Sequence, residues 1–250
     1  MCVKSVYLNK MDLTVVIPTY NEAENIPIIV ERIFNVFHEH SLEGEVIIVD
    51  DNSPDGTSKI AYQLKNTYNN LGVLCRVDKP GLSSAVLDGI QLAKGGIIGV
   101  MDADLSHPPE KIPELVKPNL SGESDLVIGS RNVKEGNIEN WSLRRKASSK
   151  LATLAARGLT HVKDPMSVFF FLKKEVIEGI ELSPKGFKID LEILVKGKYK
   201  KVTEVPILFI DRKYGVSKLS RSVILDYFSH LVRLYLYKFF MSRQLGSSLA

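Results

Sequence analysis

The feature that most constrains the fold lies in the first half of the chain, where short apolar runs end abruptly in polar or charged residues. The clearest run covers residues 97–101 and stops at Asp102 and Asp104, and two prolines follow at positions 108–109. A short apolar run bounded by glycine and by charge predicts a buried strand. Proline is common in the first turn of a helix. This stretch therefore predicts a strand, an acidic turn and a helix, in that order.

Other apolar runs alternate with helical patterns in the same way. The runs cover residues 13–17, 45–49, 71–77 and 125–128, and the helical patterns cover residues 27–37, 58–66, 83–94 and 110–120. Strands that alternate with helices at this spacing predict an α/β fold with a mostly parallel, doubly wound sheet. The composition, 44% hydrophobic and 25% charged over 250 residues, fits a globular domain with ample core.

Polar residues follow most of these strands at the point where each one ends. They are Pro18-Thr19-Tyr20-Asn21-Glu22, Asp50-Asp51-Asn52-Ser53, Asp102-Ala103-Asp104 and Gly129-Ser130-Arg131. Because the carboxyl ends of parallel strands share one edge of the sheet, we expect these groups to form one site. The carboxylates suit sugar hydroxyls and a hard cation, Mg²⁺ or Mn²⁺, that shares its shell with substrate phosphates. Arg131 suits a phosphate. The alternative for Asp102 and Asp104 is a solvated acidic turn.

Several function classes are disfavoured. The glycines at 95–99 precede a strand instead of following one, which disfavours a nicotinamide or flavin site. The net charge of +4 does not demand nucleic acid, and it fits an anionic substrate or an anionic membrane surface. The two cysteines, Cys2 and Cys75, form no disulfide framework, so a reducing compartment is expected. Residues 1–10 lack the sustained apolar core of a secretory signal.

Two segments in the second half are basic. A predicted helix over 141–159 begins with Arg144, Arg145 and Lys146. Cations are better placed at a helix C-terminus, so this placement favours an anionic ligand over a merely solvated helix end. After a predicted strand at 202–210, the segment 211–218 is basic and contains glycine, which is typical of a mobile lid and also of an ordinary exposed loop.

The tail from 222 to 240 has a helical pattern with a wide apolar face. Asp226, His230 and Arg233 form one narrow polar stripe, and the rest is largely aliphatic and aromatic. Such a face predicts burial against a membrane surface, a partner subunit or the core. No run of about 18 uncharged apolar residues exists, so we expect no segment to span a bilayer by itself. We divide the chain into a catalytic domain over 11–220 and an amphipathic interfacial helix with its tail over 221–250.

These motifs together resemble family 2 glycosyltransferases. The resemblance is carried by VVIPTYNE at 15–22, VDDNSPDGT at 49–57 and MDADLSHPP at 101–109. It continues through GSR at 129–131, WSLRRK at 141–146 and EVPILFIDRKYGVSK at 204–218, so it covers nearly everything from 13 to about 240. The last segment is the most specific, and it is similar to the branch that transfers sugars to polyprenyl phosphates.

The resemblance implies a fold and an activity. The fold would be a nucleotide-diphospho-sugar transferase of GT-A type, a Rossmann-like sheet with C-terminal amphipathic helices. The activity would be an inverting transfer of mannose from GDP-mannose to a dolichyl or polyprenyl phosphate, with Mg²⁺ or Mn²⁺. The protein would work on the membrane surface, at the cytoplasmic face, without nucleic acid.

The resemblance also implies roles for individual residues. The metal would be held by Asp102 and Asp104, and the residues that carry catalysis would be Asp104, Arg212 and Lys218. The acceptor phosphate would be held by Arg131, Arg145 and Ser149. The nucleotide sugar would be held by Pro18, Tyr20, Glu22, Val49, Asp51, Asp102, Ala103, Asp104, Arg131, Lys188, Arg212 and Lys218. Two positions depart from the pattern of the family. Ser106 stands where some relatives carry Gln, and Val168 stands where Gly is frequent.

Other functions remain open at this stage. Within the same class, the chain could use UDP-glucose to glucosylate a polyprenyl phosphate. A nucleotidyltransferase should carry a glycine-rich basic signature after its first strand, where this chain has Pro-Thr-Tyr-Asn-Glu. A non-catalytic module could bind nucleic acid or membrane through residues 144–150 and 212–221, which leaves the acidic edge unexplained.

A phosphate acceptor would remove the need for a general base. The second pKa of a phosphate monoester lies near 6, so the nucleophile is already ionised at neutral pH. The carboxylates in the acceptor half are Asp164, Asp190, Glu192 and Asp211. Of these we expect Glu192 to be the residue most easily mistaken for a base, because it could instead pair with a neighbouring cation.

Overall fold

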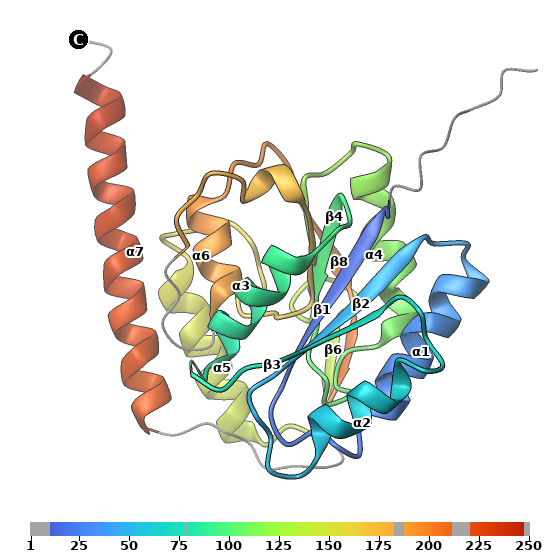
Figure 1. Ribbon diagram of the computed structural model, residues 1–250. Helices are drawn as coiled ribbons and strands as arrows, with labels where there is room; N and C mark the ends of the chain where they lie inside the picture. The colour runs from blue at the N-terminus through green and yellow to red at the C-terminus, as the bar shows by residue number, and fades with distance from the viewer. Residues whose placement is uncertain (1–10, 79, 183–187, 212–220, 248–250) are drawn as a thin grey trace, which may run out of the picture.

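The protein folds around one large mixed sheet. The computed structural model describes residues 11–78, 80–182, 188–211 and 221–247, shown as ribbons in Figure 1. The seven-stranded sheet has the order β3-β2-β1-β4-β7-β5-β8. Its strands are β1 (Leu13–Thr19), β2 (Gly44–Asp50), β3 (Leu71–Cys75), β4 (Ile97–Val100), β5 (Leu126–Ser130), β7 (Phe170–Lys173) and β8 (Val202–Pro206).

The predicted α/β fold with a mostly parallel sheet is confirmed. All neighbouring pairs in the sheet are parallel except those of β7, which lies antiparallel between β4 and β5. The apolar run before Lys173 supplies this strand. Both faces of β1, β2, β4 and β5 are buried, which is why these segments read as continuous apolar runs and not as alternating ones.

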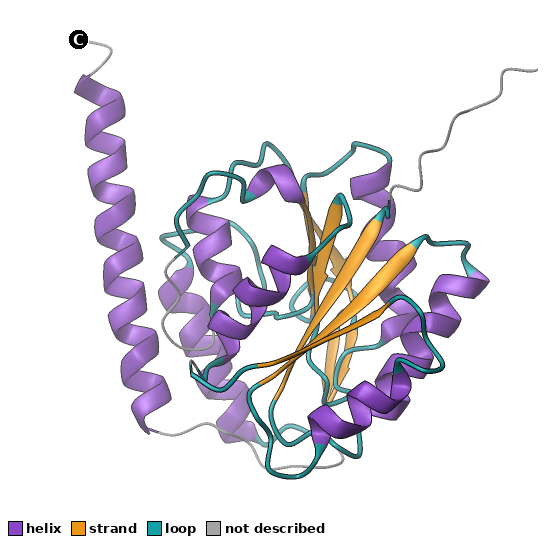
Figure 2. Ribbon diagram, in the orientation of Figure 1, coloured by secondary structure: helices purple, strands orange, loops and turns teal. Residues whose placement is uncertain are grey.

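Helices cover both faces of the sheet, as Figure 2 shows. One face carries α1 (Ile26–Glu39), α2 (Thr57–Leu64) and α4 (Ile112–Leu120), the last after the short 3-10 turn η1 (Pro109–Lys111). The other face carries α3 (Leu82–Leu92) and α6 (Ile189–Lys196), with the 3-10 turn η2 (Lys174–Val176) between β7 and α6. Gly89 lets α3 approach the sheet closely, because a Cβ there would lie 2.4 Å from a methyl group of Val16.

The segment predicted as one strand over 202–210 is divided in two. β8 pairs with β5 in the large sheet, whereas β9 (Leu208–Ile210) pairs with β6 (Asn137–Glu139) in a separate two-stranded sheet. Pro206, which has no N–H to continue a ladder, ends β8, and Ile207 follows it between the two strands. The second sheet is formed by the strands that follow β5 and β8 in the chain, so it continues from the ends of these two neighbouring strands.

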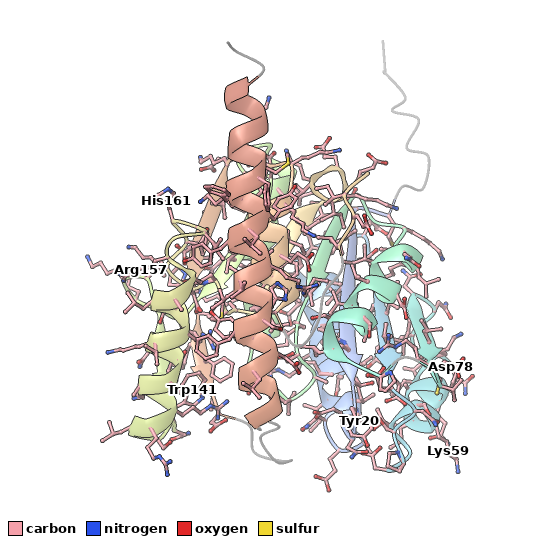
Figure 3. All side chains as sticks on the ribbon, turned by 90° about the vertical axis from the view of Figure 1, so that its left-hand side faces the viewer. Tyr20, Lys59, Asp78, Trp141, Arg157 and His161 are labelled. Atoms are coloured by element: carbon pink, nitrogen blue, oxygen red, sulfur yellow. The ribbon has the colours of Figure 1, made fainter. Side chains whose placement is uncertain are left out.

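Two helices form the remaining side of the molecule. α5 (Leu143–Ala156) and the long α7 (Arg221–Ser247) lie next to each other, as Figure 1 and Figure 3 show. The hydroxyl groups of Tyr227 and Tyr235 on α7 donate hydrogen bonds to the carbonyls of Ala152 and Ala155 on α5, each at 2.7 Å. A small apolar core joins the two helices to α6, and its α7 members are Leu231 and Leu234.

The polar stripe predicted on the last helix is corrected by this packing. Asp226 and Arg233 are exposed, but His230 is only 1% exposed and lies on the buried face with Leu231 and Leu234. Helical spacing places 230, 231 and 234 together, and this is the face that meets the domain. The exposed side of α7 carries Asp226 and Arg233 together with apolar residues such as Leu225, Phe228 and Val232.

Candidate active site

A cavity of about 440 Å³ lies at the edge where the parallel strands end. It opens beside β1 and β4, at the point where the strand order reverses direction across the sheet. Crevices at such switch points are the usual ligand sites of open α/β sheets, and the volume lies in the range of small-molecule sites. The lining residues are Pro18, Thr19, Tyr20, Glu22, Asp51, Pro80, Gly81, Leu82, Ala85, Asp102, Ala103, Asp104, Val168 and Lys188.

The acidic turn after β4 contributes Asp102 and Asp104 to this cavity. Asp104 is 5% exposed, and its Oδ1 accepts a hydrogen bond of 3.1 Å from the backbone N–H of Ser106. Leu105 has a left-handed backbone, with φ of 61°, which gives the turn its tight shape. The side chain of Ser106 is buried and lies outside the cavity lining.

The two carboxylates fit a hard divalent cation that is shared with a substrate. Among the described residues there is no group of three or more His, Cys, Asp or Glu side chains that could hold a metal ion. Mg²⁺ is usually bound by one or two carboxylates plus substrate phosphates and water, and not by a cage made wholly of protein. Asp102 and Asp104 meet that pattern if phosphate oxygens complete the shell.

His107 is buried next to the acidic turn. Its ring lies 5.2 Å from the rings of both Phe169 and Phe209, centroid to centroid, and its Nδ1 lies 3.9 Å from Asp102 Oδ2. Burial lowers the pKa of His107 to about 4, against the opposing effect of Asp104. The imidazole is therefore neutral at pH 7 and adds no positive charge beside the carboxylates.

The loops after β1 and β2 are tied together by hydrogen bonds. The backbone N–H of Asn21 donates to Ser53 Oγ, and that of Glu22 donates to Thr57 Oγ1, both at 2.9 Å. Ser53 is held in turn by Asp50 at the end of β2. The two loops thus present Tyr20 and Glu22 to the cavity as one unit.

Asp51 sits on the same wall and is paired with a buried arginine. Its Oδ1 accepts hydrogen bonds from Nε and Nη2 of Arg76, which directly follows β3. Its Oδ2 accepts the backbone N–H of Gly81 at 2.7 Å. The side chains of Arg76 and Asp51 are 5% and 9% exposed.

Arg131 lies at the end of β5 in a second buried ion pair. Its Nε and Nη2 donate to the two oxygens of Asp164 at 2.8 and 2.7 Å. Burial alone would raise the pKa of Asp164, but the hydrogen bonds from Arg131 hold it below its ordinary value. Glu204 on β8 accepts the backbone N–H groups of Lys163 and Asp164, which fixes the loop that carries the carboxylate.

Arg145, near the start of α5, is the next cation along the surface. Its Nη1 donates to both carboxylate oxygens of Asp211 at 2.6 and 2.7 Å. Its guanidinium lies 4.2 Å from the centre of the Trp141 ring, and that of Arg131 lies 5.5 Å from the same centre. Trp141 therefore lies between the two arginines, at the end of the molecule that also carries Tyr20 (Figure 3).

Lys188 reaches the cavity from the segment just before α6. Its Nζ donates to the carbonyl of Met166 at 3.3 Å. Two residues later, Asp190 is only 4% exposed, and neither of its oxygens has a hydrogen-bond partner among the described residues. Burial raises the pKa of Asp190 to about 7, against the opposing charge of Lys188.

The structure brings most of the residues predicted for nucleotide-sugar binding into one cavity. Val49 is not among them, because its side chain is wholly buried against the α3 face of the sheet. Arg131, Arg145 and Ser149 also lie outside the cavity lining. Arg212 and Lys218 lie outside the described residues. The predicted residues that line the cavity are Pro18, Tyr20, Glu22, Asp51, Asp102, Ala103, Asp104 and Lys188.

Sequence analysis missed two residues that hold this site together. Arg76 was included in the run predicted as a strand over 71–77, but β3 ends at Cys75, so Arg76 stands at the same edge as the other site residues. Asp164 was considered only as a carboxylate of the acceptor half, and its partner Arg131 is 33 residues away. The strand-end rule could have found Arg76, whereas no local pattern indicates the pairing of Asp164.

The doubly wound sheet, the cavity at its switch point and the acidic turn after β4 are typical of α/β proteins that bind a ligand at the carboxyl ends of their strands. The profile of "Glycosyl transferase family 2" matches residues 14–180. Relatives over 30% identical also match across 90% or more of the chain. The chain belongs to glycosyltransferase family 2.

Two of these relatives carry the same name. The dolichol-phosphate mannosyltransferase of Pyrococcus furiosus is 48% identical over 228 residues, which is 90% of this chain and 64% of that protein. The dolichol-phosphate mannosyltransferase of Saccharomyces cerevisiae is 38% identical over 239 residues, 92% of this chain and 89% of that protein. The chain thus spans just under two thirds of the archaeal relative.

Solved structures agree on the fold. Glucosyl-3-phosphoglycerate synthase from Mycobacterium tuberculosis, solved with Mn²⁺, UDP and phosphoglyceric acid, superposes with a TM-score of 0.64. The match covers 88% of this chain and 78% of that one at 20% identity. This likeness confirms the predicted GT-A type architecture.

Proposed function

We propose that this protein transfers mannose from GDP-mannose to dolichyl phosphate or a related polyprenyl phosphate. The names of the two relatives support the sugar and the acceptor. The observation that carries the proposal is the contrast within the site: carboxylates line the cavity, whereas the buried Arg131 and the partly exposed Arg145 lie outside its lining. A nucleotide sugar needs the first group, with a metal, and a phosphate acceptor needs the second.

The donor would lie along the cavity. Asp102 and Asp104 would hold Mg²⁺ or Mn²⁺ on the diphosphate, and Tyr20, Glu22 and Asp51 would meet the nucleoside and sugar. The cation would neutralise the charge that builds on the departing diphosphate. Lys188, which also lines the cavity, would contact the phosphates, and Arg212 and Lys218 would join it from the segment outside the described residues.

The acceptor side supports a reaction without a general base. Asp164 is bound by Arg131, Asp211 by Arg145, and Glu192 by Lys196 at 2.5 Å, as expected for a Glu192 that pairs with a cation. Asp190 is buried, and none of these carboxylates lines the cavity. A phosphate monoester needs no base, because it is already ionised near neutral pH.

The chemical step is then a single displacement. An oxygen of the acceptor phosphate forms a bond to the anomeric carbon as the bond from that carbon to the β-phosphate oxygen of GDP breaks. The electron pair leaves with GDP, and attack from the opposite face inverts the configuration at the anomeric carbon. Arg131, Arg145 and Ser149 would hold the attacking phosphate, and the two arginines both lie near the ring of Trp141.

Helices α5 and α7 would hold the protein on the membrane surface. No helix among the described residues has the length and apolar character needed to cross a bilayer. Exposed apolar side chains instead gather on these two neighbouring helices, with basic residues among them. The apolar ones are Leu143, Leu151, Leu154, Leu225, Phe228, Val232, Leu236, Phe239 and Phe240. Such a face suits the boundary between headgroups and acyl chains, and residues 221–250 would form the interfacial unit.

Vesicle flotation tests the membrane assignment. Phe228→Ser together with Leu236→Ser should reduce flotation with anionic vesicles, because both side chains are about half exposed on α7. The matched control is Ile28→Ser, since Ile28 is 41% exposed on α1, on another side of the molecule. Equal flotation of the wild-type protein, the double variant and the Ile28→Ser control would assign the apolar face to an oligomer interface instead.

The transfer itself is tested with a panel of labelled sugar nucleotides. GDP-mannose should yield a product that is extracted into organic solvent with polyprenyl phosphate, and the yield should depend on Mg²⁺ or Mn²⁺. Transfer from UDP-glucose alone would assign the chain to the glucosyltransferases of the same class. Nucleic-acid binding with steep salt dependence, and no transfer from any donor, would favour the non-catalytic alternative.

A further inference from the structure

Arg76 occupies a position that no role in the proposed reaction explains. It is 7% exposed, lies directly after β3, and does not line the cavity. A buried guanidinium is costly unless its charge and its N–H groups are all satisfied. Here they are satisfied by four residues, and two of these, Asp51 and Gly81, line the cavity.

Every N–H of this guanidinium has an acceptor. Nε and one N–H of Nη2 go to Asp51, and the other N–H of Nη2 goes to the carbonyl of Gly81 at 3.0 Å. Nη1 donates to Ser84 Oγ at 3.1 Å and to Asp88 Oδ2 at 3.0 Å. Arg76 therefore has no donor left for a ligand, and it can act only through the groups that it holds.

Two of those groups face the cavity. Asp51 and Gly81 both line it, and they are joined by the hydrogen bond from Gly81 N–H to Asp51 Oδ2. Gly81 has φ of 149°, in the region that favours glycine, so its backbone can turn toward the carboxylate. Arg76 and Asp51 together thus shape the wall formed by the start of α3.

The hydrogen bonds to Asp51 fix its carboxylate and leave one acceptor position for a ligand. A carboxylate offers about four acceptor positions, and Asp51 already accepts three hydrogen bonds. The remaining position is on Oδ2, and the charge of the carboxylate is balanced by Arg76. Without Arg76, Asp51 would lose its counter-charge and two of the three hydrogen bonds that orient its carboxylate.

The order of the strands in the sheet indicates which part of the donor would lie beside Asp51 and Gly81. Asp51 directly follows β2 and the acidic turn follows β4, and β1 lies between these two strands in the sheet. Two strand spacings amount to about 10 Å. With a diphosphate at Asp102 and Asp104, the nucleoside would lie beside Asp51, because the sugar must face Arg131, which follows β5 on the other side of β4.

We propose that Arg76 is a positioning residue for the nucleoside of the donor, which it serves by orienting and neutralising Asp51 and by fixing the Gly81 turn. The inference rests on the proposed function only in taking the donor to be a nucleoside diphosphate sugar. It predicts that Arg76 matters for ligands that contain a nucleoside and not for those that contain the diphosphate alone.

The test compares the binding of GDP and of inorganic pyrophosphate, each with Mn²⁺, by calorimetry. Arg76→Gln leaves Asp51 unpaired, and GDP binding should weaken about tenfold or more while pyrophosphate binding stays within about twofold. Arg76→Lys, which can still pair with Asp51, should recover part of the GDP affinity. Asp88→Asn is the matched control, because Asp88 contacts only the outer edge of Arg76 and is 38% exposed; it should change neither affinity by more than about threefold.

The outcomes separate this inference from the proposed function. If the wild-type protein binds UDP and not GDP, the donor assignment fails, and the same comparison is made with UDP and pyrophosphate. If both Arg76 variants lose affinity for the nucleotide and for pyrophosphate to the same extent, or keep both affinities, Arg76 has no role specific to the nucleoside. If neither variant folds, Arg76 is a structural residue only and the proposal is overturned.

Discussion

The two halves of the site hold their charges in opposite ways. In the donor half, carboxylates at the strand ends line a cavity, and one of them, Asp51, is paired with the buried Arg76. In the acceptor half, both arginines already face carboxylates, Arg131 facing Asp164 and Arg145 facing Asp211. In the donor half, a metal and a diphosphate would meet the carboxylates of Asp102 and Asp104 at the cavity, whereas in the acceptor half an incoming phosphate must share or replace the carboxylate partner of each arginine. Four substitutions probe this contrast.

The largest effect is expected in the donor half. Asp104→Asn should reduce transfer by a factor on the order of 10² or more, because it weakens the site for the cation that stabilises the leaving group. The melting temperature should hardly change, since the amide oxygen of an asparagine can still accept the hydrogen bond from the backbone N–H of Ser106. Steady-state rates and thermal melts measure the two effects, with the surface substitution Glu114→Gln as control. An Asp104→Asn enzyme with normal activity would remove the metal assignment.

The next effect concerns stability in the acceptor half. Asp164→Asn leaves the guanidinium of Arg131 buried without its counter-charge, which should cost about 3–5 kcal/mol of the free energy of unfolding. The matched control is Asp125→Asn, whose ion pair with Lys173 is partly exposed and should contribute about 0–1 kcal/mol. Urea unfolding measures both. Equal losses would mean that Arg131 finds another partner, and the contrast between the halves would be weaker than we describe.

A smaller effect should appear in the pH dependence of stability. Burial raises the pKa of Asp190 to about 7 in the folded chain, from the ordinary value of 3.8 for an Asp side chain. The folded chain therefore binds the proton more tightly than the unfolded chain, and the contribution of Asp190 to stability falls as the pH rises from about 4 to about 7. Asp190→Asn should remove that decline, which melts at a series of pH values can show. Parallel curves for the two proteins would show that Asp190 is not desolvated in solution.

The smallest effect concerns the outer arginine. Asp211→Asn should lower the KM for the acceptor about two- to fivefold, because Arg145 would then be free for the phosphate. Donor KM should not change. Glu123→Gln, which breaks the exposed pair with Lys201, is the control. A higher acceptor KM in Asp211→Asn would mean that the carboxylate orients Arg145 instead of competing for it.

The same contrast explains what sequence analysis could predict. In the donor half, the site residues directly follow apolar runs, so the carboxyl-end rule located Tyr20, Glu22, Asp51 and the acidic turn. It failed for Arg76 only because β3 ends two residues earlier than the predicted run. Val49 stayed inside the core because it belongs to a strand and not to the turn that follows it.

In the acceptor half the decisive contacts join distant segments. Arg145 and Asp211 are 66 residues apart, and β7 enters the sheet antiparallel between β4 and β5. No local periodicity encodes such pairings, which depend on how the second half packs against the first. His230 turned inward for the same reason. The roles of Arg212 and Lys218 stay predictions from the sequence.

The central claim is that the acceptor supplies its own ionised nucleophile, and turnover as a function of pH tests it most directly. Turnover should rise through about pH 6, the second pKa of the acceptor phosphate, and then reach a plateau. The measurement is repeated with Asp190→Asn, since Asp190 is the acceptor-half carboxylate whose pKa lies nearest to that range. The account predicts that the rise near pH 6 persists in this variant with donor binding unchanged. Loss of the rise, with turnover reduced about 10³-fold in a folded protein that still binds donor, would identify Asp190 as a general base and contradict the phosphate acceptor.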